Sequence, residues 1–214
     1  MVFSSYKVRY TQKTDRTSLF SERLKEDRLK RKSFTTVEEL EKYSEMTTGT
    51  LWLLSLASLG VKDVNADTAA KHAARCIGEN SFSQHLNRKR ETSGLTNSIR
   101  AQHMVQSREI LIPLDFCSKH KIELRNLVEK KNSIELEEMV FDAASRAHAN
   151  LTKVKSMRSR IPNSAHPIFR QLTPTEHFLD ELGSVNFNLF DKSLSSRYDG
   201  LAWALQKKKW KKEF

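Results

Sequence analysis

The residues of this chain that could do chemistry are few, and the most suggestive is an aspartate pair. Asp63 and Asp67 have the four-residue spacing that places two side chains on one helix face, where they could share a divalent cation. Asp63, however, follows Gly60, a residue suited to end a helix in the left-handed conformation. We therefore expect Asn65 to cap the next helix and Asp67 to lie in its first turn, and we predict no metal site here.

The other metal-binding residue types are no better placed. Glu138 and Asp142 are also four apart, but the sequence offers no glycine-rich phosphate loop and no second carboxylate pair to face them, so we interpret them as a solvated acidic face. Cys76 and Cys117 lack zinc-ligand or disulfide-framework spacing, which favours a reducing compartment. The seven histidines are scattered singly. We predict no metal, no cofactor and no catalytic residues.

Composition indicates a soluble, helix-rich protein with a polyanionic partner. Of the 214 residues, 38% are hydrophobic and 29% charged, and the six glycines and four prolines are too few for an all-β chain. The net charge of +11 favours an anionic membrane surface or nucleic acid. Nucleic acid is not predicted, because the basic residues are spread among acids instead of forming a stripe with aromatics. No apolar run has the length of a membrane span.

The C-terminal segment is the best candidate for contact with an anionic lipid surface. Lysines meet anionic head groups, and tryptophan settles at the interface between lipid and water. A solvated, lysine-rich helix end is the equally supported alternative. The candidate contact residues are Lys207, Lys208, Lys209, Trp210, Lys211 and Lys212.

Apolar periodicity predicts helices along nearly the whole chain. A charged helix is expected over residues 19–32, and another begins after a cap at Thr35 or Thr36. Further helices are expected over residues 50–59, 66–78, 114–120, 123–131, 134–160 and 173–183. The helix over 50–59 should be buried on most sides, and Thr173 should cap the last one. The helix over 134–160 has an apolar stripe from Leu136 to Val154, and its alanines 143, 144, 147 and 149 would allow close packing.

Residues 79–94 interrupt this pattern with a polar, basic and weakly periodic run. Joining Gly78 directly to Leu95 would make one continuous helix. We therefore interpret the run as an insertion within a core helix, either looped out or an artefact of the predicted gene.

Residues 95–115 resemble one signature of the squalene/phytoene synthase family, in which an asparagine, an arginine and an acidic cluster precede a second arginine and a proline. A second stretch, from Lys25 to Gly49, resembles another family segment in the right order. The matching positions singled out as structural are Tyr43, Thr48, Gly49, Asn97, Arg100, Arg108 and Pro113.

The resemblance implies an all-α isoprenoid synthase fold that is N-terminally truncated, because the region of the family's first aspartate motif is missing. The acids of the second motif are replaced as well: Ala101, Met104 and Val105 stand where the family has Asp, Glu and Asp. Diphosphate ionisation requires magnesium held between two acidic motifs. We therefore expect a pseudoenzyme in which Arg100 and Arg108 have structural roles.

Further segments resemble a mitochondrial, non-catalytic branch of the family that takes part in respiratory complex I assembly. They are Tyr43–Thr47, Leu56–Asp63, Ala66–His72, Ile99–Ala101, and Phe190, Leu194 and Trp210–Lys212. The resemblance implies complex I subunits or other assembly factors as partners, and a peripheral location on the matrix side of the mitochondrial inner membrane. The alternative is a prenyl transferase of the squalene/phytoene synthase type, seen through an incomplete gene model. We expect residues 1–18 to be a poorly ordered segment or presequence remnant, and residues 19–214 to form the helical domain.

Overall fold

The part of the chain that the computed structural model describes is helical, with no β-strand in any of its ranges. It comprises residues 34–88, 112–122, 132–195 and 200–211. The predicted all-α class is confirmed for these residues. The expected helices over residues 19–32 and 123–131, and the expected boundary between residues 18 and 19, lie outside them.

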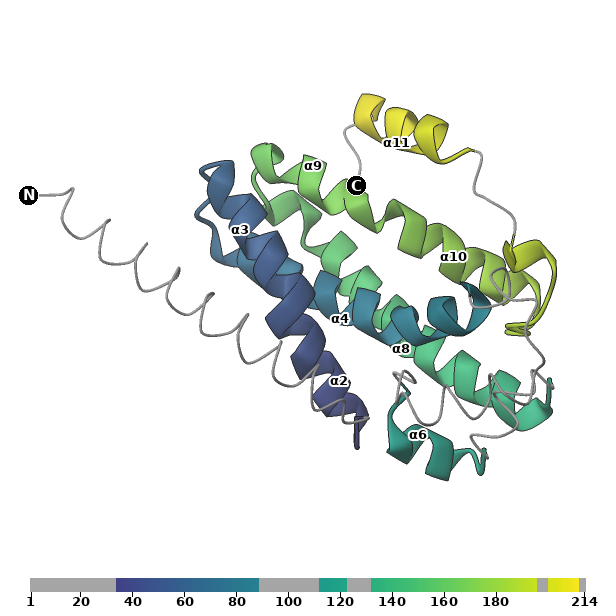
Figure 1. Ribbon diagram of the computed structural model, residues 1–214. Helices are drawn as coiled ribbons and strands as arrows, with labels where there is room; N and C mark the ends of the chain where they lie inside the picture. Colours follow the sequence, from purple (N-terminus) through teal and green to yellow (C-terminus); the bar gives the residue numbers. More distant parts are fainter. Residues whose placement is uncertain (1–33, 89–111, 123–131, 196–199, 212–214) are drawn as a thin grey trace, which may run out of the picture. The chain divides into compact units, whose positions relative to one another are not determined.

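The described helices are arranged as Figure 1 shows. In chain order they are α2 (Val37–Ser44), the π-helical turn η1 (Glu45–Gly49), α3 (Thr50–Ser58), α4 (Val64–Arg88), α6 (Leu114–Lys119), α8 (Ile134–Ser156), α9 (His166–Phe169), α10 (Thr173–Ser184) and α11 (Leu201–Trp210). Short 3-10 turns are η2 (Arg158–Arg160), η3 (Asn163–Ala165), η4 (Arg170–Leu172) and η5 (Ser193–Ser195).

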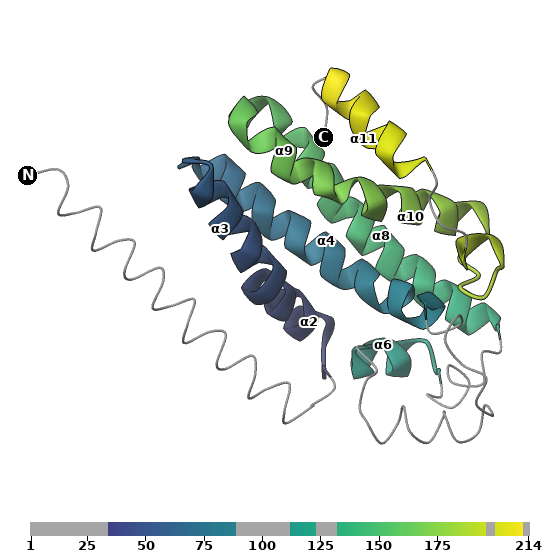
Figure 2. The ribbon, with the colours of Figure 1, turned by 45° about the horizontal axis from the view of Figure 1, so that its top comes forward.

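The two longest helices, α4 and α8, lie side by side at the centre of the core (Figure 2). Small side chains allow helix axes to approach closely, because the distance between packed helices depends on the residues at the contact. The buried alanines of this pair are Ala66, Ala69, Ala70, Ala73 and Ala74 of α4, and Ala143, Ala144 and Ala147 of α8. The prediction that Ala149 belongs to this set was wrong, since Ala149 is exposed.

Helix α8 follows the predicted apolar stripe closely. Its start is capped by the Ser133 hydroxyl, which accepts a hydrogen bond from the Leu136 amide at 3.2 Å. Every predicted stripe residue from Leu136 to Val154 is buried. The helix ends at Ser156, earlier than expected, and the final predicted residues form the 3-10 turn η2.

Asp63 and Asp67 lie at the beginning of α4, as predicted. Gly60 adopts a left-handed conformation with φ of 72°, as predicted. The capping residue is Asp63, whose Oδ1 accepts from the Ala66 amide at 2.8 Å. The prediction that Asn65 caps this helix was therefore wrong, whereas Asp67 does lie in the first turn.

The end of α4 corrects the expected interruption at residue 79. The helix runs without a break to Arg88, so residues 79–88 are not looped out, and residues 89–94 lie outside the described ranges. Polar side chains face the interior at three positions of this stretch, which weakens its apolar pattern. Glu79, Asn80 and Ser83 are all buried. A pattern rule that equates burial with apolar residues could not find them.

Helix α3 is less buried than its composition suggests. Trp52 and Leu56 enter the core, and Trp52 meets Phe169 edge to face with ring centroids 5.4 Å apart. Leu51 is 64% exposed and Leu54 42% exposed, so the prediction that this helix is buried on most sides was wrong.

The start of α10 also differs from its prediction. Thr173 is the first residue of the helix and makes no capping hydrogen bond, because the cap position belongs to Leu172. Pro174 lies in the first turn, as expected. The helix ends at Ser184, one residue beyond the predicted Gly183.

Helices α2 and α4 make their closest approach at Gly78. A Cβ atom added to Gly78 would lie 1.8 Å from Ser44 Oγ and 2.5 Å from Ser44 Cβ. The Ser44 hydroxyl donates to the Leu40 carbonyl oxygen at 2.8 Å, so this polar group is satisfied although it is buried. A side chain at position 78 would push the two helices apart.

We expect Gly78→Ala to destabilise the protein, although alanine favours a helix more than glycine does. Overpacking a close helix contact typically costs about 1–3 kcal/mol. Gly183→Ala is the matched control, because nothing lies within 4 Å of the added Cβ; that change should be neutral or stabilising by up to about 1 kcal/mol. Urea unfolding measures the stability of both variants. Equal midpoints of the two unfolding transitions would contradict a close contact between Gly78 and Ser44.

Candidate functional site

The predicted family positions fall into two groups. Asn97, Arg100 and Arg108 lie outside the described residues. The structure places Tyr43, Thr48, Gly49 and Pro113 near the packing contacts of α2, η1 and α6.

Tyr43, Thr48 and Gly49 belong to the α2–η1 segment that packs on α4. The Tyr43 ring contacts the Phe34 ring, with centroids 5.2 Å apart. Thr48 is half-buried in the π-helical turn. A Cβ at Gly49 would lie 3.3 Å from Ala74 Cβ, so glycine permits a close approach between η1 and α4. These contacts are structural.

Pro113 belongs to a contact that we call the α2–α6 junction, formed by residues 34–37 and 113–116. Pro113 is buried and holds an extended conformation directly before α6. The Leu114 amide donates to the Phe34 carbonyl oxygen at 3.0 Å, and the Asp115 amide donates to the Thr35 carbonyl oxygen at 3.1 Å. The two family segments thus meet through backbone hydrogen bonds.

Side chains complete this junction and cap α2. The Thr36 hydroxyl accepts from the Glu39 amide at 3.3 Å, so the predicted cap is Thr36. The Glu39 carboxylate accepts from the Thr35 amide at 2.7 Å, and Asp115 Oδ2 accepts from the Val37 amide at 3.2 Å. Amides at the start of α2 are therefore satisfied partly by a residue from α6.

A buried polar network crosses the α4–α8 interface. Asn150 Nδ2 donates to Glu79 Oε2 at 3.0 Å, and His72 Nδ1 lies 3.0 Å from Asn150 Oδ1. Because Asn150 uses its NH₂ group toward Glu79, its oxygen must accept, and the His72 Nδ1 carries the proton. This network was not predicted from the sequence. Its one signal was Asn150, a polar residue within the apolar stripe of α8.

Glu41 of α2 connects the network to charged groups nearer the surface. It lies 3.8 Å from Arg75 Nε and 3.5 Å from Arg146 Nη1. Arg75 also pairs with Glu45. The Glu41 carboxyl also raises the pKa of Glu79, so these polar side chains link α2 electrostatically to α4 and α8.

The environment of Glu79 favours its protonated form. Burial raises the pKa of this carboxyl, the Asn150 hydrogen bond lowers it and the neighbouring Glu41 raises it, and the net pKa is about 8. Glu79 Oε1 is buried and has no hydrogen-bond partner among the described residues, which adds to the cost of placing a charge there.

Other carboxylates are engaged by cations of the chain. Asp142 lies 2.5 Å from Lys119 Nζ and 3.4 Å from His120 Nε2. Burial would raise the pKa of Asp142, but the hydrogen bonds from Lys119 and His120 lower it overall. Asp142 is 27% exposed and Glu138 is exposed, so the pair lies at the surface of α8, where Lys119 and His120 lie beside Asp142. In the described part of the chain, no three His, Cys, Asp or Glu side chains are grouped as a metal site.

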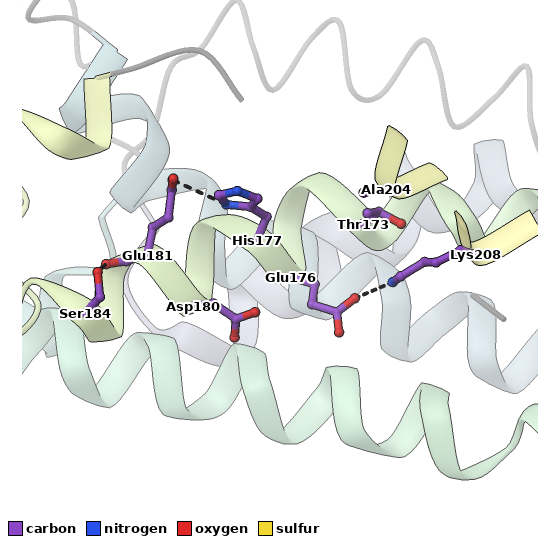
Figure 3. Close-up of a pocket in the computed structure, with 8 residues that line it drawn as sticks. All are labelled: Thr173, Glu176, His177, Asp180, Glu181, Ser184, Ala204 and Lys208. Carbon is purple, nitrogen blue, oxygen red and sulfur yellow. Dashed lines mark hydrogen bonds and ion pairs between the residues drawn. The ribbon is translucent and has the colours of Figure 1, made fainter. Parts of the chain in front are cut away.

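An open groove of about 410 Å³ separates α10 from α11. Figure 3 shows Glu176 of α10 directed toward Lys208 of α11. The Lys208 ammonium donates to Glu176 Oε2 at 2.5 Å, and Lys155 of α8 donates to Oε1 of the same carboxylate. Burial would raise the pKa of Glu176, but the two lysines lower it overall. This carboxylate therefore holds α11 beside α10 and α8.

The predicted lysines of α11 do not share one environment. Lys208 is half-buried in the groove, whereas Lys207, Lys209 and Lys211 are exposed, and Lys212 lies outside the described residues. Trp210 is exposed and meets Trp203 edge to face, with ring centroids 6.3 Å apart. Trp203 was not among the predicted contact residues. Its spacing of two helical turns from Trp210 indicates that both rings lie on one helix face. None of the helices described is long and apolar enough to cross a membrane.

We expect Glu79→Gln to make stability less dependent on pH. The pKa of Glu79 is about 8 in the folded protein, against 4.5 in the unfolded chain. The folded state therefore binds the extra proton, and its stabilisation is lost as pH rises from about 4.5 through about 8. Glutamine imitates the protonated carboxyl, so the variant should gain on the order of 4 kcal/mol over the wild type near pH 8, and about 1 kcal/mol near pH 5.

Thermal or urea unfolding across this pH range measures the effect. Glu45→Gln is the control, because Glu45 is a partly exposed member of the Arg75 ion pair. Parallel pH profiles for the wild type and Glu79→Gln would show that Glu79 does not titrate in this window.

Relatives with curated names share most of this chain. The chain is 30% identical over 191 residues to NADH dehydrogenase (ubiquinone) complex I, assembly factor 6, from Rattus norvegicus, covering 89% of this chain and 53% of that protein. The human protein of the same name is 28% identical over the same shares. The homolog from Dictyostelium discoideum is 29% identical over 181 residues, 83% of this chain and 46% of that protein. The chain thus spans about half the length of these relatives.

No solved structure matches the chain. The family profile described as squalene/phytoene synthase matches residues 22–204, which is most of the sequence. This match agrees with the helical fold. The chain therefore belongs to the squalene/phytoene synthase family.

Proposed function

We propose that this protein is a non-catalytic assembly factor for mitochondrial respiratory complex I. The observation that carries the proposal is the similarity, over most of this chain, to proteins named complex I assembly factor 6 in several animals and in Dictyostelium discoideum. Its partners would be complex I subunits or other assembly factors.

The replaced acidic residues support a non-catalytic role. A prenyl synthase must stabilise a departing diphosphate, and it does so with magnesium ions held by carboxylates. Ala101, Met104 and Val105 provide no carboxylate where the family resemblance places that motif. A retained fold without these ligands can still provide surfaces for binding other proteins.

The described family positions support a scaffold role. Gly49 permits close packing on α4, and Pro113 precedes the α2–α6 junction. Both stabilise the fold through contacts that need no substrate. Selection for a stable helical domain accounts for their presence without catalysis.

The charge supports a location on the matrix side of the mitochondrial inner membrane, as a peripheral protein. A net charge of +11 favours association with an anionic surface. A protein held there would meet membrane-embedded subunits as they are assembled.

We expect loss of the gene to lower the amount of assembled complex I, and re-expression of the chain to restore it. Native gel electrophoresis with in-gel NADH oxidation measures the assembled enzyme, and complex II measured on the same gels is the control. A normal level of complex I in cells without the gene would contradict the proposal.

The recombinant chain should release no diphosphate from farnesyl diphosphate in the presence of magnesium. An active squalene synthase assayed in parallel is the control. Magnesium-dependent release above the protein-free rate would favour the alternative, a prenyl transferase of the squalene/phytoene synthase type.

A further inference from the structure

Helix α11 presents two tryptophans and a lysine together on one side. Trp203, Lys207 and Trp210 are spaced four and three residues apart, which places them on one helix face. Lys207 Nζ lies 5.8 Å from the centroid of the Trp203 ring. Trp203 is 63% exposed and Trp210 is 69% exposed. We call these three residues the tryptophan face.

The other side of α11 is attached to the rest of the domain. Ala204 and Lys208 line the groove beside α10, and Lys208 donates to Glu176. Its side chain is 19% exposed. The ion pair with Glu176 fixes the rotation of α11 about its own axis, and in this orientation the tryptophan face is exposed.

We propose that the tryptophan face binds the surface of an anionic phospholipid membrane. An indole ring is apolar except for its N–H, and it settles where the head groups meet the acyl chains. Lysine stems can lie along the apolar region while their ammonium groups reach the phosphates. Lys207, Lys209 and Lys211 are exposed beside the indoles, and residues 201–212 contain no Asp or Glu to repel an anionic surface.

The geometry favours a lipid surface over nucleic acid or a protein partner. The two indoles meet edge to face at 72°, and Lys207 covers the Trp203 ring, so the pair offers no open platform for stacked bases. A protein partner would have to present a pocket shaped to fit the two indoles in this arrangement. A lipid interface accepts both at once without shaped pockets.

This inference rests on the proposed peripheral location at a membrane, but its test does not involve complex I. Vesicle binding reports the membrane surface alone, and the gene-deletion experiment reports assembly alone. Either proposal can therefore fail while the other stands.

The experiment measures binding of the full chain to phosphatidylcholine vesicles that contain cardiolipin, and to phosphatidylcholine vesicles alone, by flotation. Binding should require cardiolipin and shift tryptophan emission to shorter wavelength. Lys207→Ala with Lys211→Ala should weaken binding about 25-fold, at about fivefold for each lysine near an anionic surface. Trp203→Ala and Trp210→Ala should each weaken binding about tenfold, because each removes an indole that leaves water on binding.

Matched controls test whether the effect belongs to this face. Lys42→Ala with Lys153→Ala removes the same charge from exposed positions on α2 and α8, and Leu51→Ala with Leu54→Ala removes exposed apolar side chains from α3. Both control pairs should bind vesicles nearly as well as the wild type. Circular dichroism confirms that each variant is folded, as expected for exposed positions.

Three outcomes would overturn the inference. The first is equal binding with and without cardiolipin, and the second is an equal loss in the lysine controls and the α11 variants. The third is binding to heparin or RNA through Lys207 and Lys211 without binding to vesicles, which would identify a general polyanion site.

Discussion

The packing of α4 on α8 is the contact on which the rest of the domain depends. Alanines on both helices bring the backbones together, and α2 reaches α4 because position 78 has no side chain. Within this close contact lies an uncommon arrangement, a buried glutamate bonded to an asparagine of the facing helix. A charged carboxylate there would be costly, so burial and the neighbouring Glu41 keep Glu79 protonated. The domain is thus held together by close helix packing and by the buried hydrogen bond between Asn150 and Glu79.

The contacts that stabilise this fold are distinct from the residues that a prenyl synthase needs for catalysis. A synthase needs carboxylates on facing helices to hold magnesium, whereas a scaffold needs those helices only to remain packed. The chain lacks acids at residues 101, 104 and 105, and it keeps glycine and proline where helices meet. These packing contacts are compatible with the proposed assembly role, which requires a stable helical domain.

Much of the fold could be predicted from the sequence because its signals are local. Thr36, Gly60 and the stripe of α8 act through caps, backbone conformation and periodicity, and each lies where its pattern predicts. The errors arose where tertiary contacts override local pattern. Glu79, Asn80 and Ser83 are polar but buried, which weakens the apolar pattern at the end of α4. Helix α3 is apolar on a side that the described residues leave exposed. Asp63 and not Asn65 caps α4, which is a choice between neighbouring residues that spacing alone cannot make.

Local patterns also predicted only part of the candidate site. Composition found the lysine-rich end of the chain, but it could not separate Lys208, which faces Glu176, from the lysines that face water. That division depends on how α11 sits against α10, and so on residues far away in the sequence. The polar network had only a weak signal, since one asparagine in an apolar stripe does not identify its partner on another helix.

The α2–α6 junction also bears on the order in which the domain forms. The Asp115 carboxylate and the Val37 amide are separated by 78 residues. Closing a flexible loop of that length costs about 4 kcal/mol of chain entropy, whereas α2, η1 and α3 follow one another without a gap. The contiguous helices can therefore form early, and α6 docks only once the chain between has collapsed.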